Sequence, residues 1–349
     1  MRRIRKLWIA LLAVPIVLVG ADVLYWRVAE RNLDDGFADW MAGRRAAGWT
    51  AVSGKPVRSG WPLAATLTVP LVSLKGGDPD IPGGLTWSTD RVVLRIALLH
   101  PRMLEIASDG MQRLRLGDGP EIPYTADRLR VVLPLQSGVP AHSAALAANN
   151  LRAGMPTAVD SASALTIGSL RLHWDMRPAA PSGEPALAFS LDADGIVPPS
   201  GVARALGPRI ASFAIDGALD GPVPRTRALA LRAEAWRDGG GTLEIHHVAL
   251  TWGPLDLSAS ATLALDEQLQ PMGTGTARVV GYAETLDALA AHNVVSRSAA
   301  TAAKAVLSLL AQAPDDGGPP DVEVPLTLQY RTLSMRQVPL VRLPELDWP

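Results

Sequence analysis

Apolar and polar residues alternate along much of this chain, and the alternation restricts the folds that it can adopt. In the clearest run, Leu255 to Asp266, every second residue is apolar and most of the residues between them are polar. Neighbouring residues of a strand point to opposite faces, so such a run is typical of an antiparallel strand with one buried face. Similar runs cover residues 129–135, 187–191, 213–219 and 322–330. We therefore expect a mainly β body.

Turn-forming residues separate these runs. Clusters of Gly, Pro and Asp stand at 76–79, 117–120, 220–222 and 238–241. Strands separated by such clusters are typical of a meander. Residues 136–163 are small and polar, so we expect a connector between two β halves at about 49–135 and 164–349. Within this connector, Ala144 to Leu151 is compatible with either a strand or a helix.

One segment of the body has helical spacing. Residues 283–312 are rich in Ala, and a break near His292-Asn293 predicts two helices there. The expected fold is a large antiparallel β domain, 49–349, with this helical insert. Because its strands carry one apolar face each, two sheets could close as a sandwich or one sheet could curve over the helices. In a third arrangement, a curved apolar face stays partly open and holds acyl chains.

The N-terminus has the pattern of a membrane anchor. Four positive residues stand within positions 2–6, and Leu7–Trp26 follows them. As a helix this segment is about 30 Å long, which matches a bilayer core. Aromatic residues prefer both membrane interfaces, and positive residues stay in the cytoplasm. We expect residues 1–27 to form a single pass through the inner membrane, with the body in the periplasm. The expected anchor contacts are Leu7, Trp8, Tyr25 and Trp26.

Two other interpretations of the N-terminus remain open. Val19-Gly20-Ala21 is an acceptable cleavage site for a signal peptide. A core helix of a soluble protein fits poorly with four leading positive charges. Against cleavage, helical patterning continues beyond Trp26 through Leu33 and Phe37, so we expect a juxtamembrane amphipathic helix over 28–48.

Composition excludes several classes of function. The chain has 349 residues and no cysteine, which rules out disulfides, thiol catalysis and Cys-ligated zinc or iron–sulfur clusters. Its 33 basic and 34 acidic side chains give a net charge of −1 and no reason to expect nucleic acid as a partner. We assign no cofactor.

Few residues suggest a site. His246-His247 is the only histidine pair, and the apolar parity changes there, which indicates a β-bulge rather than a metal site. No catalytic, metal-binding or cofactor-binding residue is assigned. Trp61 stands between a glycine and a proline and is a candidate for a plug at the end of a sheet or for contact with a membrane or ligand. The candidates for an apolar groove or plug are Trp61, Trp236 and Trp252.

Four short motifs in the second half of the chain carry a family resemblance. They are Trp236-Arg237-Asp238 with Gly239-Gly240, Trp252-Gly253-Pro254-Leu255, Leu263-Ala264-Leu265-Asp266 and Gln270-Pro271-Met272-Gly273. With Gly60-Trp61-Pro62 and residues 338–344, they resemble an uncharacterised bacterial envelope family, the domain of unknown function 2125. The likeness covers most of the chain after residue 7. It implies an inner-membrane anchor with an exported β-rich domain, and no catalytic residue. The layout is similar, more loosely, to AsmA-like envelope proteins.

Three functions are compatible with these features. The first is a non-catalytic, membrane-anchored scaffold that binds another envelope protein. The second is a lipid-binding or lipid-transfer protein that uses an apolar β groove. The third is a hydrolase, which would need a cleft that brings together distant groups such as His173, Asp175 and Glu244.

Overall fold

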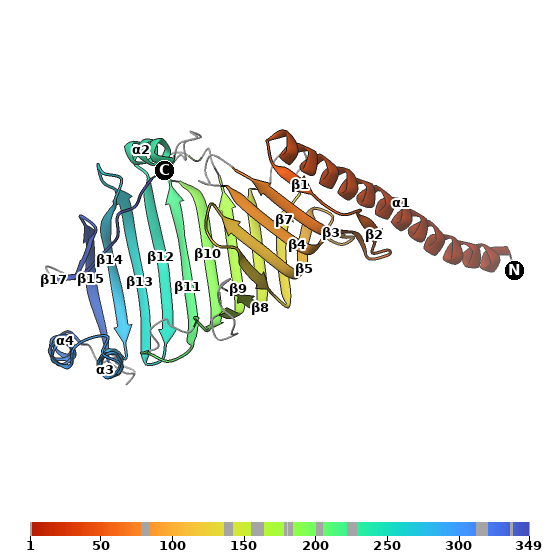
Figure 1. Cartoon of the computed structure of the whole chain (residues 1–349). Helices are drawn as coiled ribbons and strands as arrows, with labels where there is room; N and C mark the ends of the chain where they lie inside the picture. Colours follow the sequence, from red (N-terminus) through yellow and green to blue (C-terminus); the bar gives the residue numbers. More distant parts are fainter. Residues whose placement is uncertain are drawn as a thin grey trace.

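The computed structural model describes residues 2–77, 84–135, 142–154, 164–177, 180, 184–199, 205–221, 229–311, 320–335 and 338–348. In the first helix it describes the exposure of Gly20 and the side chains from Asp22 onward. The described residues form four helices and one sheet of seventeen strands (Figure 1). The helices are α1 Arg2–Ala46, α2 Leu229–Asp238, α3 Tyr282–Ala291 and α4 Arg297–Leu310.

The strands follow the alternating runs of the sequence and the turn residues between them. The first nine are β1 Thr50–Val52, β2 Val57–Ser59, β3 Ala64–Gly76, β4 Leu85–Ala97, β5 Met103–Leu116, β6 Ile122–Thr125, β7 Arg128–Pro134, β8 Ser143–Ala153 and β9 Leu165–Met176. The others are β10 Pro185–Ile196, β11 Ile210–Asp220, β12 Thr242–Trp252, β13 Leu255–Leu265, β14 Pro271–Val280, β15 Asp321–Gln329, β16 Thr332–Met335 and β17 Val338–Arg342.

Strands pair almost in chain order, and every pair is antiparallel. Both β1 and β2 pair with β3, which pairs with β4, and β4 pairs with β5. The short strands β6 and β7 share the space between β5 and β8. From β8 to β17 each strand pairs with the next. The predicted mainly β, antiparallel fold is confirmed, and the described strands form one sheet rather than the two of a sandwich.

The stretch that the sequence left ambiguous is a strand of this sheet. β8 lies within 136–163 and covers Ala144 to Leu151. It pairs with β7 on one side and β9 on the other, so the two expected halves belong to one continuous sheet. The flanking residues 136–141 and 155–163 lie outside the described part of the chain.

One face of the sheet carries a continuous apolar row across most of its strands. Residues that stand opposite one another in the register form an unbroken apolar row over twelve strands. The row is Leu67, Leu94, Ile106, Val131, Leu146, Leu172, Leu191, Ile215, Val248, Ala259, Ala277 and Val324. At the usual spacing between strands the row is about 50 Å long. Because all its members face the same side, this side must be covered or must meet an apolar partner.

Helix α1 covers one end of this face. It contains 45 residues and runs beside β3, in the same direction, and past the end of the sheet (Figure 1). Ala29 and Leu33 pack on Leu67, Val69 and their neighbours, and partly buried Trp26 borders this cluster. Met41 packs on Ala51 and Leu74 nearer the end of the helix.

The expected anchor and juxtamembrane segments belong to this single helix. Leu7 and Trp8 lie outside the residues whose side chains are described, and Tyr25 is partly exposed. In the part of the chain that the structure describes, no helix meets the length and apolarity required of a membrane span.

The other helices lie away from α1, near the strands of the second half of the sheet (Figure 1). The segment expected to be helical, 283–312, contains α3 and α4, and their break is at the predicted place, with Asn293 at φ 57°. Leu307 and Leu310 of α4 pack on Val322 and Val324. Helix α2 stands at the ends of β11 and β12 and was not predicted.

Candidate functional site

The middle of the apolar face is the most unusual surface of the molecule. We call a set of sixteen large apolar residues of β7 to β12 on this side the central apolar face. All of them are only half-buried. They are Leu129, Val131, Leu133, Leu146, Leu170, Leu172, Trp174, Phe189, Leu191, Phe213, Ile215, Leu219, Leu243, Ile245, Val248 and Leu250. Sixteen such side chains in one patch are far more than the scattered surface apolar residues of soluble proteins.

The helices explain why this patch stays half-buried. Among the described residues, α1 packs on β1 and β3, α2 and α3 on β13, and α4 on β15. The buried clusters accordingly involve β1, β3 to β5 and β13 to β16. Between them, small residues such as Ala144, Ala148 and Ala193 are buried by their larger neighbours, while the large side chains keep part of their surface free.

The central apolar face is suited to hydrocarbon. Its residues carry no charge, and the indole N–H of Trp174 is the one hydrogen-bonding group among their side chains, so the face offers little to a polar ligand. Covering apolar surface is worth about 25 cal/mol per Å², or about 0.8 kcal/mol for each methylene group that leaves water. An acyl chain lying along several side chains of this patch would therefore gain substantial free energy without any specific polar contact.

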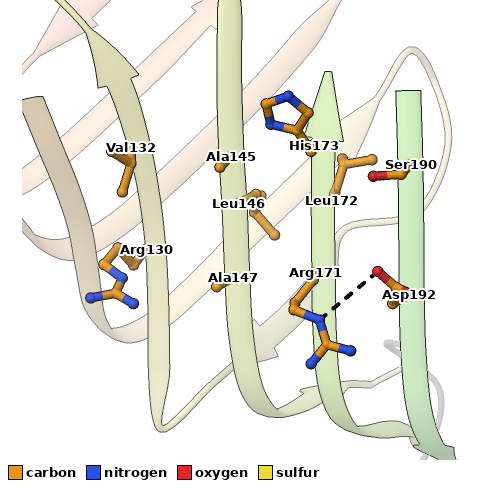
Figure 2. A pocket seen from close by; sticks show the side chains of 10 residues that line it. All are labelled: Arg130, Val132, Ala145, Leu146, Ala147, Arg171, Leu172, His173, Ser190 and Asp192. Atoms are coloured by element: carbon orange, nitrogen blue, oxygen red, sulfur yellow. Dashed lines mark ion pairs between the residues drawn. The ribbon is translucent and has the colours of Figure 1, made fainter. Parts of the chain in front are cut away.

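The reverse face is polar and carries a shallow hollow. Its accessible volume is about 320 Å³, and Ala145 and Ala147 leave space there beside Arg130, Arg171 and His173 (Figure 2). The guanidinium of Arg171 lies 3.9 Å from Asp192 and 3.8 Å from Asp194. Arg130 lies 3.5 Å from Glu105. Because carboxylates balance both arginines, the hollow has no strong preference for an anion.

The histidine pair lies on a β-bulge, as the change of parity predicted. The register of β12 shifts between Asp216 and Gly217 against β11 and between Ile245 and Val248 against β13. Exposed His246 lies 3.5 Å from both Asp216 and Glu244. No group of three or more metal-ligating side chains occurs in the described ranges.

The groups considered for a hydrolase do not form a cluster. His173 and Asp175 lie on β9, and Glu244 lies on β12, with β10 and β11 between them. The closest charged partner of Glu244 is His246. The reverse face therefore gives this set no common cleft.

The three tryptophans named from the sequence occupy different positions. Trp61 lies in the turn between β2 and β3, is 52% exposed and precedes a cis proline. Trp236 is buried at the end of the sheet, where its indole N–H donates to the Asp220 carbonyl oxygen at 2.9 Å. Trp252 ends β12 and donates to the Gly207 carbonyl oxygen at 3.0 Å. Trp252 lies on the same side of β12 as Val248 and Leu250 and adjoins the central apolar face, whereas Trp61 and Trp236 lie outside the strands that carry it.

A polar patch that the sequence did not reveal interrupts the apolar side near α1. Buried Thr89 and Gln112 stand opposite each other, and Tyr124 follows in the register. The Trp87 indole donates to the Tyr124 hydroxyl oxygen at 2.9 Å. Burial raises the pKa of Tyr124, and this hydrogen bond opposes part of the rise. Both amide atoms of Gln112 lack a partner among the described residues. The alternating pattern around Gln112 was a signal that this side chain points inward.

Comparison with known proteins gave one family. The family model described as "Uncharacterized protein conserved in bacteria (DUF2125)" matches residues 26–344. Neither the curated proteins nor the solved structures gave a match. The matched range begins at the part of α1 that packs on β3 and includes the whole sheet.

Proposed function

We propose that this chain, which belongs to the family of uncharacterised proteins conserved in bacteria (DUF2125), is a membrane-anchored envelope protein that binds lipid acyl chains on its central apolar face. The observation that carries the proposal is the unbroken apolar row from Leu67 to Val324, whose middle is only half-buried. This role needs no catalytic group. It uses the face that the four described helices leave without a cover.

The N-terminal helix supports a site at a membrane. The segment Leu7–Trp26 has the length and apolar composition of a span, and positive residues precede it. The same helix continues without interruption to Ala46 and packs on β3. A rigid connection of this kind would hold the apolar face at a fixed position relative to the bilayer, with the sheet in the periplasm.

Photo-crosslinking of the full chain in native membranes tests the binding of acyl chains. A photoreactive amino acid replaces Leu172 in one variant and Leu191 in another, both on the central apolar face. After irradiation, mass spectrometry of the purified protein should detect phospholipid adducts at both positions. Acyl chains within contact distance are the expected targets because hydrocarbon that covers this face removes its apolar surface from water.

Matched controls come from the adjacent residues of the same strands. His173 follows Leu172 and Ser190 precedes Leu191, and both point to the reverse face. The same photoreactive residue at these two positions should give few lipid adducts. Equal yields of adducts on the two faces would contradict the proposal, because they would indicate random collisions with lipid.

A scaffold that binds another envelope protein is the second candidate. It is supported by β17, which is exposed along its whole length and pairs with β16 only in the described part of the sheet. Val338, Leu340 and Val341 are about half exposed. Exposed edge strands can accept a strand from another protein.

Substitution within β17 separates the two candidates. Leu340→Lys places a charge on the exposed edge while leaving the central apolar face intact. If the edge binds a partner strand, the protein–protein product seen on crosslinking in cells should disappear in this variant. The lipid adducts at Leu172 should remain. If the crosslinked products are unchanged, β17 does not carry the interaction.

A further inference from the structure

We propose that the turns before β3 and after β4 form a second contact with the bilayer, beside the anchor helix. The contact residues are Trp61, Leu63 and Leu99, and we call them the apolar rim. The proposal rests on the membrane anchoring proposed above. It adds that the β domain touches the lipid surface and is not held at a distance from it by α1.

The apolar rim is strongly exposed. Leu63 is 73% exposed, Leu99 is 85% exposed, and Trp61, two residues before Leu63, is 52% exposed. Large apolar side chains rarely have this much free surface, and here three of them occur together.

A hydrogen bond joins the two turns that carry the rim. The backbone N–H of Leu98 donates to the Leu63 carbonyl oxygen at 3.0 Å. Leu63 and Leu99 therefore lie side by side at one end of the sheet. The rim is a single surface made by two rigid turns.

The rim lies at the level of α1 where the outer membrane interface is expected. Asp34 of α1 forms an ion pair with Arg58, which stands opposite Leu67 in the register. Ala64 precedes Leu67 by about 10 Å of strand, and about seven helical residues cover the same distance. Ala64 is thus level with Arg27, and the turn before it is level with Tyr25 and Trp26. Partly buried Trp26 packs against the cluster that includes Ala65 and Ile96, which agrees with this placement of the helix beside the strand.

The chemistry of the rim favours a bilayer interface. Trp and Leu enter the boundary between headgroups and acyl chains, where Trp is the preferred aromatic residue. Within 60–63 and 98–102, the ionisable side chains are His100 and Arg102, and there is no acidic residue. A guanidinium beside apolar residues suits phosphate headgroups, which would repel carboxylates.

The absence of cysteine in the chain gives a clean labelling experiment. Single-cysteine variants Leu63→Cys and Leu99→Cys carry a polarity-sensitive fluorophore, and the full chain is reconstituted in phosphatidylcholine–phosphatidylglycerol vesicles. Matched controls are Leu71→Cys, farther along β3 at 68% exposure, and Leu309→Cys on α4 at 86%. Lipids brominated near the headgroup serve as the quencher.

The expected result is a blue shift and a loss of emission for labels at Leu63 and Leu99, with no change at Leu71 and Leu309. If the chain floats with the vesicles but none of the four labels is quenched, the rim does not touch lipid, the anchor stands and the rim contact is overturned. If the rim labels are shielded from a water-soluble quencher but not reached by brominated lipid, the rim contacts protein instead, and the proposal is overturned. If the chain fails to float with vesicles, anchoring itself is wrong, and the rim contact is overturned with it.

Discussion

Trp236 and Gly241 pack against each other so closely that a Cβ atom on Gly241 would lie 2.2 Å from the indole ring. The indole is held in place by its hydrogen bond to Asp220, the last residue of β11. Gly241 stands just before β12. The pair therefore closes the end of the sheet between two central strands and fixes α2 there.

Gly241→Ala should destabilise the fold by about 1–3 kcal/mol, because the added methyl group overlaps the ring and forces it to move. Urea unfolding followed by circular dichroism measures the change. Gly36→Ala is the control, since a Cβ atom there meets nothing within 4 Å, and alanine in a helix should stabilise the protein slightly. An unchanged midpoint for Gly241→Ala would mean that the tryptophan does not close this end.

Leu67 and Leu172 belong to the same apolar row, but of the two only Leu67 packs on a helix in the described part of the chain. Leu67→Ala removes a fully buried side chain and should cost about 2–5 kcal/mol. Leu172→Ala removes a half-buried side chain and should cost at most about 1 kcal/mol. Comparison of the two unfolding midpoints tests whether the middle of the face is open. Equal losses would indicate that something covers Leu172.

Tyr124 should ionise at higher pH than an ordinary tyrosine, because burial raises its pKa. The folded protein holds the phenol proton more tightly than the unfolded chain does. The stabilising contribution is therefore complete below the usual tyrosine pKa of about 10 and is lost as the pH rises through the folded value. Ultraviolet titration of tyrosinate should show a late component that disappears in Tyr124→Phe. In Trp87→Phe, which removes the opposing hydrogen bond, that component should move to still higher pH.

Leu191→Asp should abolish the lipid adducts expected at Leu172, because the two side chains stand opposite each other on neighbouring strands. A carboxylate cannot be covered by hydrocarbon without a large desolvation cost. Ser190→Asp is the matched control on the reverse face and should leave adducts at Leu172 unchanged. Mass spectrometry measures the yield of lipid adducts at position 172 in both variants. Adducts that persist in Leu191→Asp would count against binding on this face.

The strands were predictable because alternation and turn residues are local signals. The bulge at the two histidines was also predictable, because the apolar residues change parity between Ile245 and Val248. Residues 144–151 stayed ambiguous because a run dominated by Ala and Asn has little preference for either period. The pairing of β8 with both neighbours decided in favour of a strand.

Helix α2 and the extent of the open face were not predictable in the same way. Leu229, Ala233 and Trp236 have helical spacing, but the segment is short and was interpreted only through its tryptophan. Alternation at Leu172 or Leu191 indicates that one side is apolar, but it carries no information on what covers that side. That depends on where α1 and α4 pack, which is a property of the whole chain.

Because each strand pairs almost entirely with its neighbours in the chain, the sheet can be assembled in order, hairpin after hairpin, from one end of the chain to the other. Contacts between residues close in sequence need little loop-closure entropy, which favours fast formation. The same connectivity allows a hairpin to be added or lost at the β17 edge without rearrangement of the other strands. A protein built this way can change its length in evolution and keep the surface that it presents.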